Sequence, residues 1–458
     1  MPVTVLNSNP VLTEVPVEVE CTADYRPFWK GEWHLRVFGG DGREVLSQEG
    51  QPESLLPFNW RKKVSFMADL PGVSVSHFEL KASPGKRRVA AALPENPYLR
   101  YRIDRNRGLI TSLQGRSKTP LLEGPLLEPL VIKDQGDSWG TGCSEYRDVL
   151  GRFRLVPGSL KVIEKGIVRT VTESVLTYKK SRVVFQVLGY PRWPVLEFRL
   201  RVHWNEERAM LKLAVPTRLR SGRVLCEVPG GEIHRPADGQ EHVFGRWALI
   251  EEDKGGRRMA LAVIGSGQHG LDFKDGELRV SALRSAAYCH ERGFKLADSP
   301  ARKFMDQGGH EMRFLVTAGE AEKVRRSVAS LADWLSAPPY ALAHLPLGEM
   351  KAGVGSDGEM DESPGAKQIG PGDLPDEREL SLLTLNPQNI RLTACKPSWD
   401  GRALVLRLHE TCGQVTSAQL TIYKPLRVIN LRFQPFEIKT LRFERTGAWR
   451  EADLISET

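Results

Sequence analysis

The sequence lacks long apolar runs and an N-terminal targeting segment. Among the 458 residues, no apolar stretch approaches the ~20 residues that a membrane-spanning helix needs. The first residues, MPVTVLNSNPVLTEV, contain neither a basic segment nor an apolar core, so no signal peptide is visible. These absences predict a cytoplasmic protein that has no membrane among its partners.

Cysteine is also scarce, and its spacing excludes two classes of small domain. The six cysteines are scattered and no CxxC pair occurs, which argues against a zinc ribbon and against a disulfide framework. We therefore expect free thiols in a reducing compartment. The ten histidines show no metal-binding spacing, so no metal site is predicted in this chain.

The short motifs of several enzyme classes are missing. The chain contains no phosphate-binding GxxxxGK[ST], no GxSxG and no HExxH. The stretch GSGQHG at 265–270 lies between strand patterns with no helix after it, so it is interpreted as a turn. Basic residues exceed acidic ones by only 65 to 57, and the excess is spread through the chain, which argues against a nucleic-acid partner.

What the sequence does contain is alternation of apolar and polar residues. Stretches such as VLEFRLRVHW at 195–204 and HEMRFLVT at 310–317 have the two-residue period of β-strands, and turn signals separate them. One segment, 318–339, instead repeats apolar residues every three or four positions and stops at a Pro pair, which predicts a short helix near 320–336. Closely spaced strands without interleaved helices favour an all-β fold built from sandwiches.

Changes in composition divide the chain into four parts. A weak change in composition near 82–92 predicts the end of a small N-terminal β-sandwich, residues 1–90. A large β-sandwich is then expected over 91–340. Residues 341–380 include a stretch rich in Gly, Pro, Asp and Glu that cannot bury enough apolar surface to fold, so we predict a flexible linker. Residues 381–458 carry four more strand patterns and form a C-terminal β unit, which we expect to pack against the rest.

Four loop clusters combine acidic, aromatic and basic residues in the way that sugar binding requires. Aromatic faces cover the C–H side of a sugar ring, while Asp, Gln, His and Arg side chains pair with its hydroxyls. The predicted substrate-binding residues are Asp137 and Trp139 in DSWG, His234 and Arg235 in EIHRPADGQEH, Arg284 in LRSAAYCHE, and Asp306, Gln307 and His310 in DQGGHE.

Each cluster also has a structural interpretation. Asp137 would simply bond to its own turn backbone, Trp139 would belong to the core, and Arg235 would be held by a buried acid. The sequence alone leaves these alternatives open.

Taken in order, these stretches resemble the C-terminal, all-β portion of glycoside hydrolase family 38, the retaining α-mannosidases. The resemblance covers nearly the whole chain. It is carried by VTVLNSNPVLTEVPVEV, FMADLPGVSVSHFEL, LPENPYLRYRIDRNRGLITSL, GDSWGTG, YPRWPVLEFRLRVHWNEERAMLKLAVP, CEVPGGEIHRP, LRSAAYC, DQGGHEMRFLV and LNPQNIRLTACKPSWDGRALVLRLHE. It implies that residues 91–340 form a galactose-mutarotase-like supersandwich with smaller β-sandwich units beside it.

The resemblance also implies what the chain does not contain. In the family, the zinc-binding residues and the nucleophilic Asp lie on an upstream β/α barrel, and nothing here corresponds to it. No catalytic residue is therefore assigned, no cofactor is expected in this chain, and zinc is expected only in the missing barrel. The loop that matches DSWG lies on the side turned toward that barrel and forms a wall of the sugar pocket.

Three hypotheses follow for the function. The chain is an accessory part of a family 38 α-mannosidase that needs a separately encoded catalytic barrel as its partner, or a stand-alone carbohydrate-binding protein, or an independent sugar epimerase or lyase. In the first, exposed anchors for the barrel would be Trp139, Arg147, Arg235 and Arg284. The third needs a facing His and Glu, drawn from His234, His310, Glu232 and Glu311.

Overall fold

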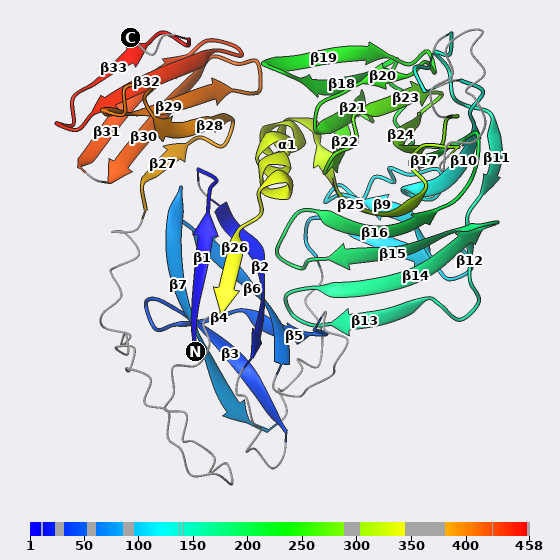
Figure 1. Ribbon diagram of the computed structural model, residues 1–458, viewed down its shortest axis with the longest axis horizontal. Helices are drawn as coiled ribbons and strands as arrows, with labels where there is room; N and C mark the ends of the chain where they lie inside the picture. Colours follow the sequence, from blue (N-terminus) through cyan, green and yellow to red (C-terminus); the bar gives the residue numbers. More distant parts are fainter. Residues whose placement is uncertain are drawn as a thin grey trace.

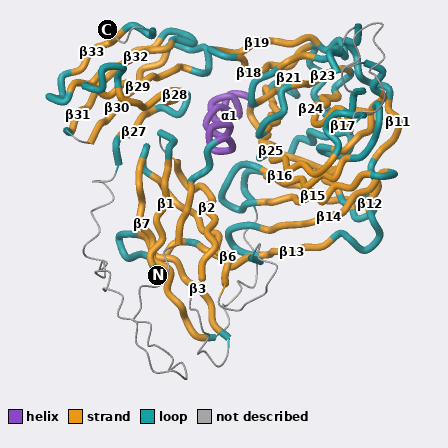
Figure 2. The backbone as a smooth tube through the Cα atoms, viewed as in Figure 1, coloured by secondary structure: helices purple, strands orange, loops and turns teal. Residues whose placement is uncertain are grey.

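The described residues form three β units arranged around one helix (Figures 1 and 2). The computed structural model describes residues 1–10, 12–22, 32–52, 61–85, 96–136, 138–140, 142–287, 303–343, 381–423 and 425–455. Within these residues, no helix has the length and apolar character that a membrane crossing requires. All paired strands run antiparallel.

The N-terminal unit is a sandwich of two sheets. One sheet has the order β26-β1-β7-β3-β4 and the other the order β2-β6-β5. Alternating residues such as Val3, Val5, Leu35 and Val37 fill the space between them. The strands are β1 (Pro2–Asn7), β2 (Leu12–Thr22), β3 (Trp33–Gly39), β4 (Glu44–Val45), β5 (Ser47–Gly50), β6 (Arg61–Leu70), β7 (Ser74–Pro84) and β26 (Tyr340–Ala343).

The largest unit is a supersandwich of a ten-stranded sheet over a six-stranded one. The larger sheet has the order β12-β14-β15-β16-β25-β22-β21-β18-β19, with β13 paired to β14, and the smaller has the order β11-β10-β17-β24-β23-β20. In β16, Phe198, Leu200 and Val202 enter the core between the sheets, while Arg199 and Arg201 point away, as strand geometry dictates. This alternation explains why the period of two in the sequence predicted the strands correctly.

The strands of this unit begin with the hairpin β8 (Arg100–Asp104) and β9 (Leu109–Gln114). The six-stranded sheet contains β10 (Glu128–Lys133), β11 (Val149–Arg152), β17 (Ala209–Pro216), β20 (His242–Val243), β23 (Gly270–Lys274) and β24 (Glu277–Arg284). The ten-stranded sheet contains β12 (Arg154–Leu155), β13 (Lys161–Lys165), β14 (Thr170–Tyr178), β15 (Ser181–Gly189), β16 (Leu196–Trp204), β18 (Arg223–Val228), β19 (Gly231–Pro236), β21 (Trp247–Asp253), β22 (Arg258–Gly265) and β25 (Gly308–Glu320).

The helix α1 (Ala321–Ser336) lies at the centre of the molecule, between the three units (Figure 1). It packs against β21, β22 and β25, on the face of the ten-stranded sheet that points away from the six-stranded one. Its buried residues Val324, Val328, Leu331 and Leu335 are those whose spacing predicted the helix. The prediction of one short helix near 320–336 is confirmed.

The C-terminal unit is a second small sandwich. A sheet of order β27-β30-β31 faces one of order β28-β29-β32-β33, and leucines such as Leu385, Leu406 and Leu420 form the core between them. The strands are β27 (Leu383–Asn386), β28 (Ile390–Pro397), β29 (Ala403–Glu410), β30 (Thr416–Tyr423), β31 (Leu426–Phe433), β32 (Ile438–Glu444) and β33 (Trp449–Ala452).

Two arginines and two carboxylates join the C-terminal unit to the centre of the molecule. Asp333 of α1 accepts hydrogen bonds from Arg246 (2.6 Å) and from Arg391 of β28 (2.7 Å). Glu227 of β18 also binds Arg246, at 2.5 Å. The charged group therefore connects α1, the supersandwich and the C-terminal unit at one point.

The all-β class, with a large sandwich and smaller β-sandwich units beside it, is confirmed, but one predicted boundary is wrong. Residues 341–343, expected to begin the linker, instead complete β26 and pair with β1 of the N-terminal unit. Ala341 and Ala343 pack against the core there, which explains why they continue the strand. The rest of the predicted linker, residues 344–380, lies outside the described residues.

Candidate functional site

The segment 134–148, which contains the DSWG stretch, lies across the outer face of the six-stranded sheet. It is attached through backbone hydrogen bonds at its two ends, from Asp134 N–H to Arg208 O and from Lys133 N–H to Asp148 O. Beneath it, Tyr146 packs on an apolar cluster that includes Ile132 and Met210. The segment is thus built onto the sheet.

Charged residues beneath this segment form a buried network. The ammonium group of Lys212 in β17 is fully buried and lies 2.6 Å from Asp272 and 2.5 Å from Glu241. Arg147, from the segment itself, also binds Asp272 and lies 3.5 Å from Glu277 of β24. Because Asp272 is completely buried, these cations compensate a charge that water cannot reach.

A second ion pair holds the segment nearer to Trp139. Asp134, which is 1% exposed, accepts a hydrogen bond from Arg284 Nη2 at 3.1 Å, and its other oxygen lies 2.9 Å from Arg284 Nε. Burial alone would lower the pKa of Arg284, but the hydrogen bond and charge of Asp134 raise it. The guanidinium also lies 5.3 Å from the centre of the Tyr146 ring, and burial raises the pKa of that phenol to about 12.

Two glycines let the backbone wrap closely around Arg284. A Cβ at Gly136 would lie 2.5 Å from Arg284 Nη2, so no other residue fits there without displacing the guanidinium. Gly140 has a φ of +69°, which disfavours residues with a side chain. Gly136 is therefore required by the close approach of Arg284, and Gly140 by the backbone conformation of the turn.

Trp139 stands on top of this anchored segment with 73% of its surface exposed. The interpretation that it belongs to the sandwich core is wrong, because most of its side chain faces solvent. Its predicted neighbour Asp137 lies outside the described residues.

Three of the predicted residues lie beside the same arginine, at the start of β25. Asp306 accepts a hydrogen bond from the Arg284 backbone N–H at 3.1 Å, and its own carbonyl oxygen lies 2.8 Å from His310 Nε2. Gln307 donates to the backbone carbonyl of Glu206 at 3.1 Å. The structure therefore brings Arg284, Asp306, Gln307 and His310 together, although the guanidinium of Arg284 forms an ion pair with Asp134.

The remaining predicted residues lie on β19, at the edge of the ten-stranded sheet. Arg235 donates two hydrogen bonds to Val243 O, at 3.0 and 3.2 Å. A backbone hydrogen bond from Glu241 to Ser144 places the adjoining loop against the far end of segment 134–148. His234 is exposed, and partial burial and the nearby Arg223 lower its pKa. His234 and Arg235 therefore do not join the group around Trp139.

The structure does not pair a histidine with a glutamate from the four residues considered for epimerase chemistry. His310 and Glu311 are consecutive in β25 and so point to opposite faces of the sheet. Glu232 forms an ion pair with Arg325 of α1. Among the described residues, no group of three or more His, Cys, Asp or Glu side chains is placed to hold a metal ion.

Comparison with known proteins identifies the central part of the chain. Residues 94–292 match the family described as Glycosyl hydrolases family 38 C-terminal domain. These residues belong to that family. The family 38 domain includes segment 134–148, Arg284 and β19, whereas Asp306 and His310 follow it in the sequence.

Relatives of the family 38 domain extend the match to most of the chain. α-Mannosidase G of Dictyostelium discoideum is 21% identical over 364 residues, which are 70% of this chain and 29% of that protein. The crystal structure of an α-mannosidase from Enterococcus faecalis V583 superposes with a TM-score of 0.69 at 14% identity, over 97% of this chain and 56% of the other. A second family 38 structure from Enterococcus faecalis gives 0.70, at 14% identity, over 97% and 58%. The likeness to the two structures shows a shared fold, and this chain spans less than two thirds of each relative.

Lys212 and Asp272, which lie buried beneath the exposed loop of the family 38 domain, were missed by sequence reasoning. Lys212 and Asp272 each stand alone among apolar residues, in AMLKLAVP and GLDFK. A single charge inside an apolar strand is a signal that could have indicated a buried ion pair. Nothing local could have paired them, because 60 residues separate the two in the sequence.

Proposed function

We propose that this chain is the noncatalytic, substrate-side β portion of a family 38 α-mannosidase-type glycoside hydrolase. It would act on α-linked mannose or a related sugar together with a catalytic barrel that lies outside these 458 residues. The observation that supports this most directly is the exposed Trp139, carried on a loop that buried ion pairs fix to the family 38 domain.

The surroundings of Trp139 suit recognition of a sugar. An indole face covers the apolar side of a sugar ring, and the proposal assigns the polar contacts with the sugar hydroxyls to Gln307 and His310. A retaining glycosidase also needs two carboxyl groups about 5–5.5 Å apart. Asp134 is bound to Arg284 and Asp306 to the Arg284 backbone, so the proposal assigns the nucleophile and the zinc to the barrel.

The proposed barrel-facing surface differs from the one expected from sequence. Arg147 and Arg284 were expected as exposed anchors, but their side chains are only 16% and 24% exposed and are bound to carboxylates. Val149 and Leu150 of β11, at the edge of the same sheet, are instead 40% and 50% exposed. With Trp139, they are the apolar side chains that we expect the barrel to cover, and a stable contact would bury more than ~2,000 Å² in total.

The test is to co-express the chain with a family 38 catalytic barrel, followed by size-exclusion chromatography and a zinc-dependent aryl α-mannoside assay. We expect co-elution and activity in the complex, and no hydrolysis by the chain alone. Trp139→Ala should lower kcat/KM about tenfold, equivalent to about 1.4 kcal/mol, at an unchanged melting temperature. Trp399→Ala is the matched control, since Trp399 is 83% exposed but lies in the C-terminal unit.

Two results would contradict the proposal. The first is chelator-sensitive turnover by the purified chain alone, which would reveal a catalytic site within it. The second is separate elution from the barrel with no gain of activity on mixing. That outcome would leave a stand-alone carbohydrate-binding protein as the better account.

A further inference from the structure

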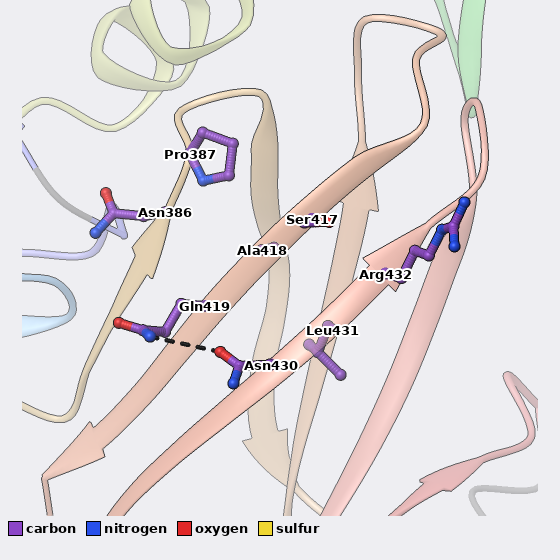
Figure 3. A pocket seen from close by; sticks show the side chains of 8 residues that line it. All are labelled: Asn386, Pro387, Ser417, Ala418, Gln419, Asn430, Leu431 and Arg432. Atoms are coloured by element: carbon purple, nitrogen blue, oxygen red, sulfur yellow. Dashed lines mark hydrogen bonds between the residues drawn. The ribbon is translucent and has the colours of Figure 1, made fainter.

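The C-terminal unit has a surface pocket of about 600 Å³ that lies outside the family 38 domain match. It lies on the sheet formed by β27, β30 and β31 (Figure 3). Its lining residues are Asn386, Pro387, Ser417, Ala418, Gln419, Asn430, Leu431 and Arg432. This volume is in the range of about 300–1,000 Å³ that small-molecule sites occupy.

Strand register places three amide side chains in one row across this sheet. Asn386 of β27 is paired with Gln419 of β30, which is paired with Asn430 of β31. All three are exposed, because the residues next to them, such as Leu385 and Leu420, point into the core. Directly opposite neighbours have Cβ atoms only about 5 Å apart, so the amides form a continuous polar strip.

The polar groups of this strip have unused hydrogen-bonding capacity. Gln419 Nε2 lies 3.4 Å from Asn430 Oδ1, a long contact that occupies one donor and one acceptor (Figure 3). The side chains of Asn386, Ser417 and Arg432 make no hydrogen bond or ion pair with any other residue that the structure describes. Each amide supplies two donors and an acceptor, and the serine hydroxyl supplies both kinds of group.

The polar side chains that line the pocket indicate which class of ligand it can bind. A sugar hydroxyl both donates and accepts hydrogen bonds, which amides match and which a purely cationic or anionic surface does not. Pro387 adds apolar surface beside the amides, whereas Ala418 and Leu431 are only 5% and 9% exposed and pack in the core of the unit. None of the described residues that line the pocket carries a carboxylate, so they supply neither an acid nor a nucleophile for glycoside hydrolysis.

We propose that this pocket is a second carbohydrate-binding site, specific for neutral saccharides, in which Gln419 and Asn430 make the principal hydrogen bonds. The site is independent of Trp139, since the C-terminal unit and β10–β11 lie on opposite sides of the molecule (Figure 1). It would hold a glycan without cleaving it.

The test is calorimetric titration of the full chain with three neutral trisaccharides, α-linked mannotriose, maltotriose and cellotriose, and with trigalacturonate as an anionic comparison. Concentrations up to about 10 mM would reveal dissociation constants in the millimolar range. At least one trisaccharide should bind, and the double variant Gln419→Ala/Asn430→Ala should weaken that binding about tenfold, as loss of two hydrogen bonds implies. Gln434→Ala, which removes an exposed amide just beyond β31 and outside the pocket, should leave affinity unchanged. Equal melting temperatures would show that all variants are folded.

Three outcomes would overturn the proposal. One is no binding of any of the three sugars. Another is binding that Trp139→Ala abolishes and Gln419→Ala/Asn430→Ala leaves intact, which would place the only sugar site on the anchored loop. The third is preferential binding of trigalacturonate that Arg432→Gln abolishes, which would make the pocket an anion site. None of these outcomes depends on a catalytic barrel, so this test and the co-expression test fail independently.

Discussion

The ion pair between Asp134 and Arg284 should determine how firmly the loop that carries Trp139 is held. Replacing Asp134 by Asn keeps the shape of the side chain and removes its charge. The amide oxygen can still accept from Gly136 N–H, which now lies 2.9 Å from Asp134 Oδ1. The amide nitrogen, however, would face Arg284 Nε at the position of the oxygen that is now 2.9 Å away. One donor would then oppose another in a buried site.

The size of the effect follows from the burial of the two partners. Breaking a fully buried ion pair by removing one partner costs about 3–5 kcal/mol. The Arg284 side chain is 24% exposed, so water compensates part of the loss, and we expect about 2–3 kcal/mol. If the substitution lowers the free energy of local opening of segment 134–148 by this amount, amide exchange there accelerates roughly 30- to 150-fold.

Hydrogen–deuterium exchange read by mass spectrometry measures this directly. Peptides that span 130–148 should exchange faster in Asp134→Asn, while peptides from β29 in the C-terminal unit should not change. Asp148→Asn is the matched control, because Asp148 lies at the end of the same segment and its side chain is exposed without a hydrogen bond to the described residues. If protection is unchanged in Asp134→Asn, or if both variants accelerate exchange equally, the ion pair does not hold the loop.

Two further predictions concern buried charges elsewhere. Lys212→Met leaves the buried Asp272 with Arg147 as its remaining close partner, so the free energy of unfolding should fall by about 3 kcal/mol in urea titrations. Lys274→Met, at a partly exposed position of β23, is the control and should change the free energy of unfolding little. Equal losses in the two variants would refute the role of Lys212 in compensating Asp272. Burial would raise the pKa of Glu197, but Arg199 and Arg313 lower it to about 2, below its ordinary value of 4.5. Its contribution to stability is therefore present above about pH 5 and is lost as the pH falls toward 2, so the stability difference between wild type and Glu197→Gln should shrink over that range, and a constant difference would contradict this.

The fold was predictable because it depends on a local pattern. Each strand of the supersandwich has one face in a core, so alternation along a few residues is enough to reveal it, as in β16 and β25. The helix α1 was predictable for the same reason, with its own period. The strand β26 was missed because only four residues pair with β1, and a pattern of that length carries no period.

The candidate site was predictable in residue type but not in geometry. Trp139 and Arg284 were singled out as members of sugar-binding clusters, yet only the folded chain shows that one is exposed and the other committed to a buried carboxylate. Asp134 lies 150 residues from Arg284 in the sequence, and no periodicity connects them. Pairings of this kind follow from which strands become neighbours in a sheet.

The exposure of Trp139 and the burial of Arg284 are two consequences of one arrangement. An apolar side chain on a long loop would ordinarily fold back onto the nearest apolar surface. Here Tyr146 occupies the apolar cluster beneath the loop, and Trp139 remains 73% exposed. The ion pair between Asp134 and Arg284 holds the backbone on which this exposed side chain is carried. Such exposure is what the proposed function requires, since a sugar or the catalytic barrel would cover Trp139 on binding.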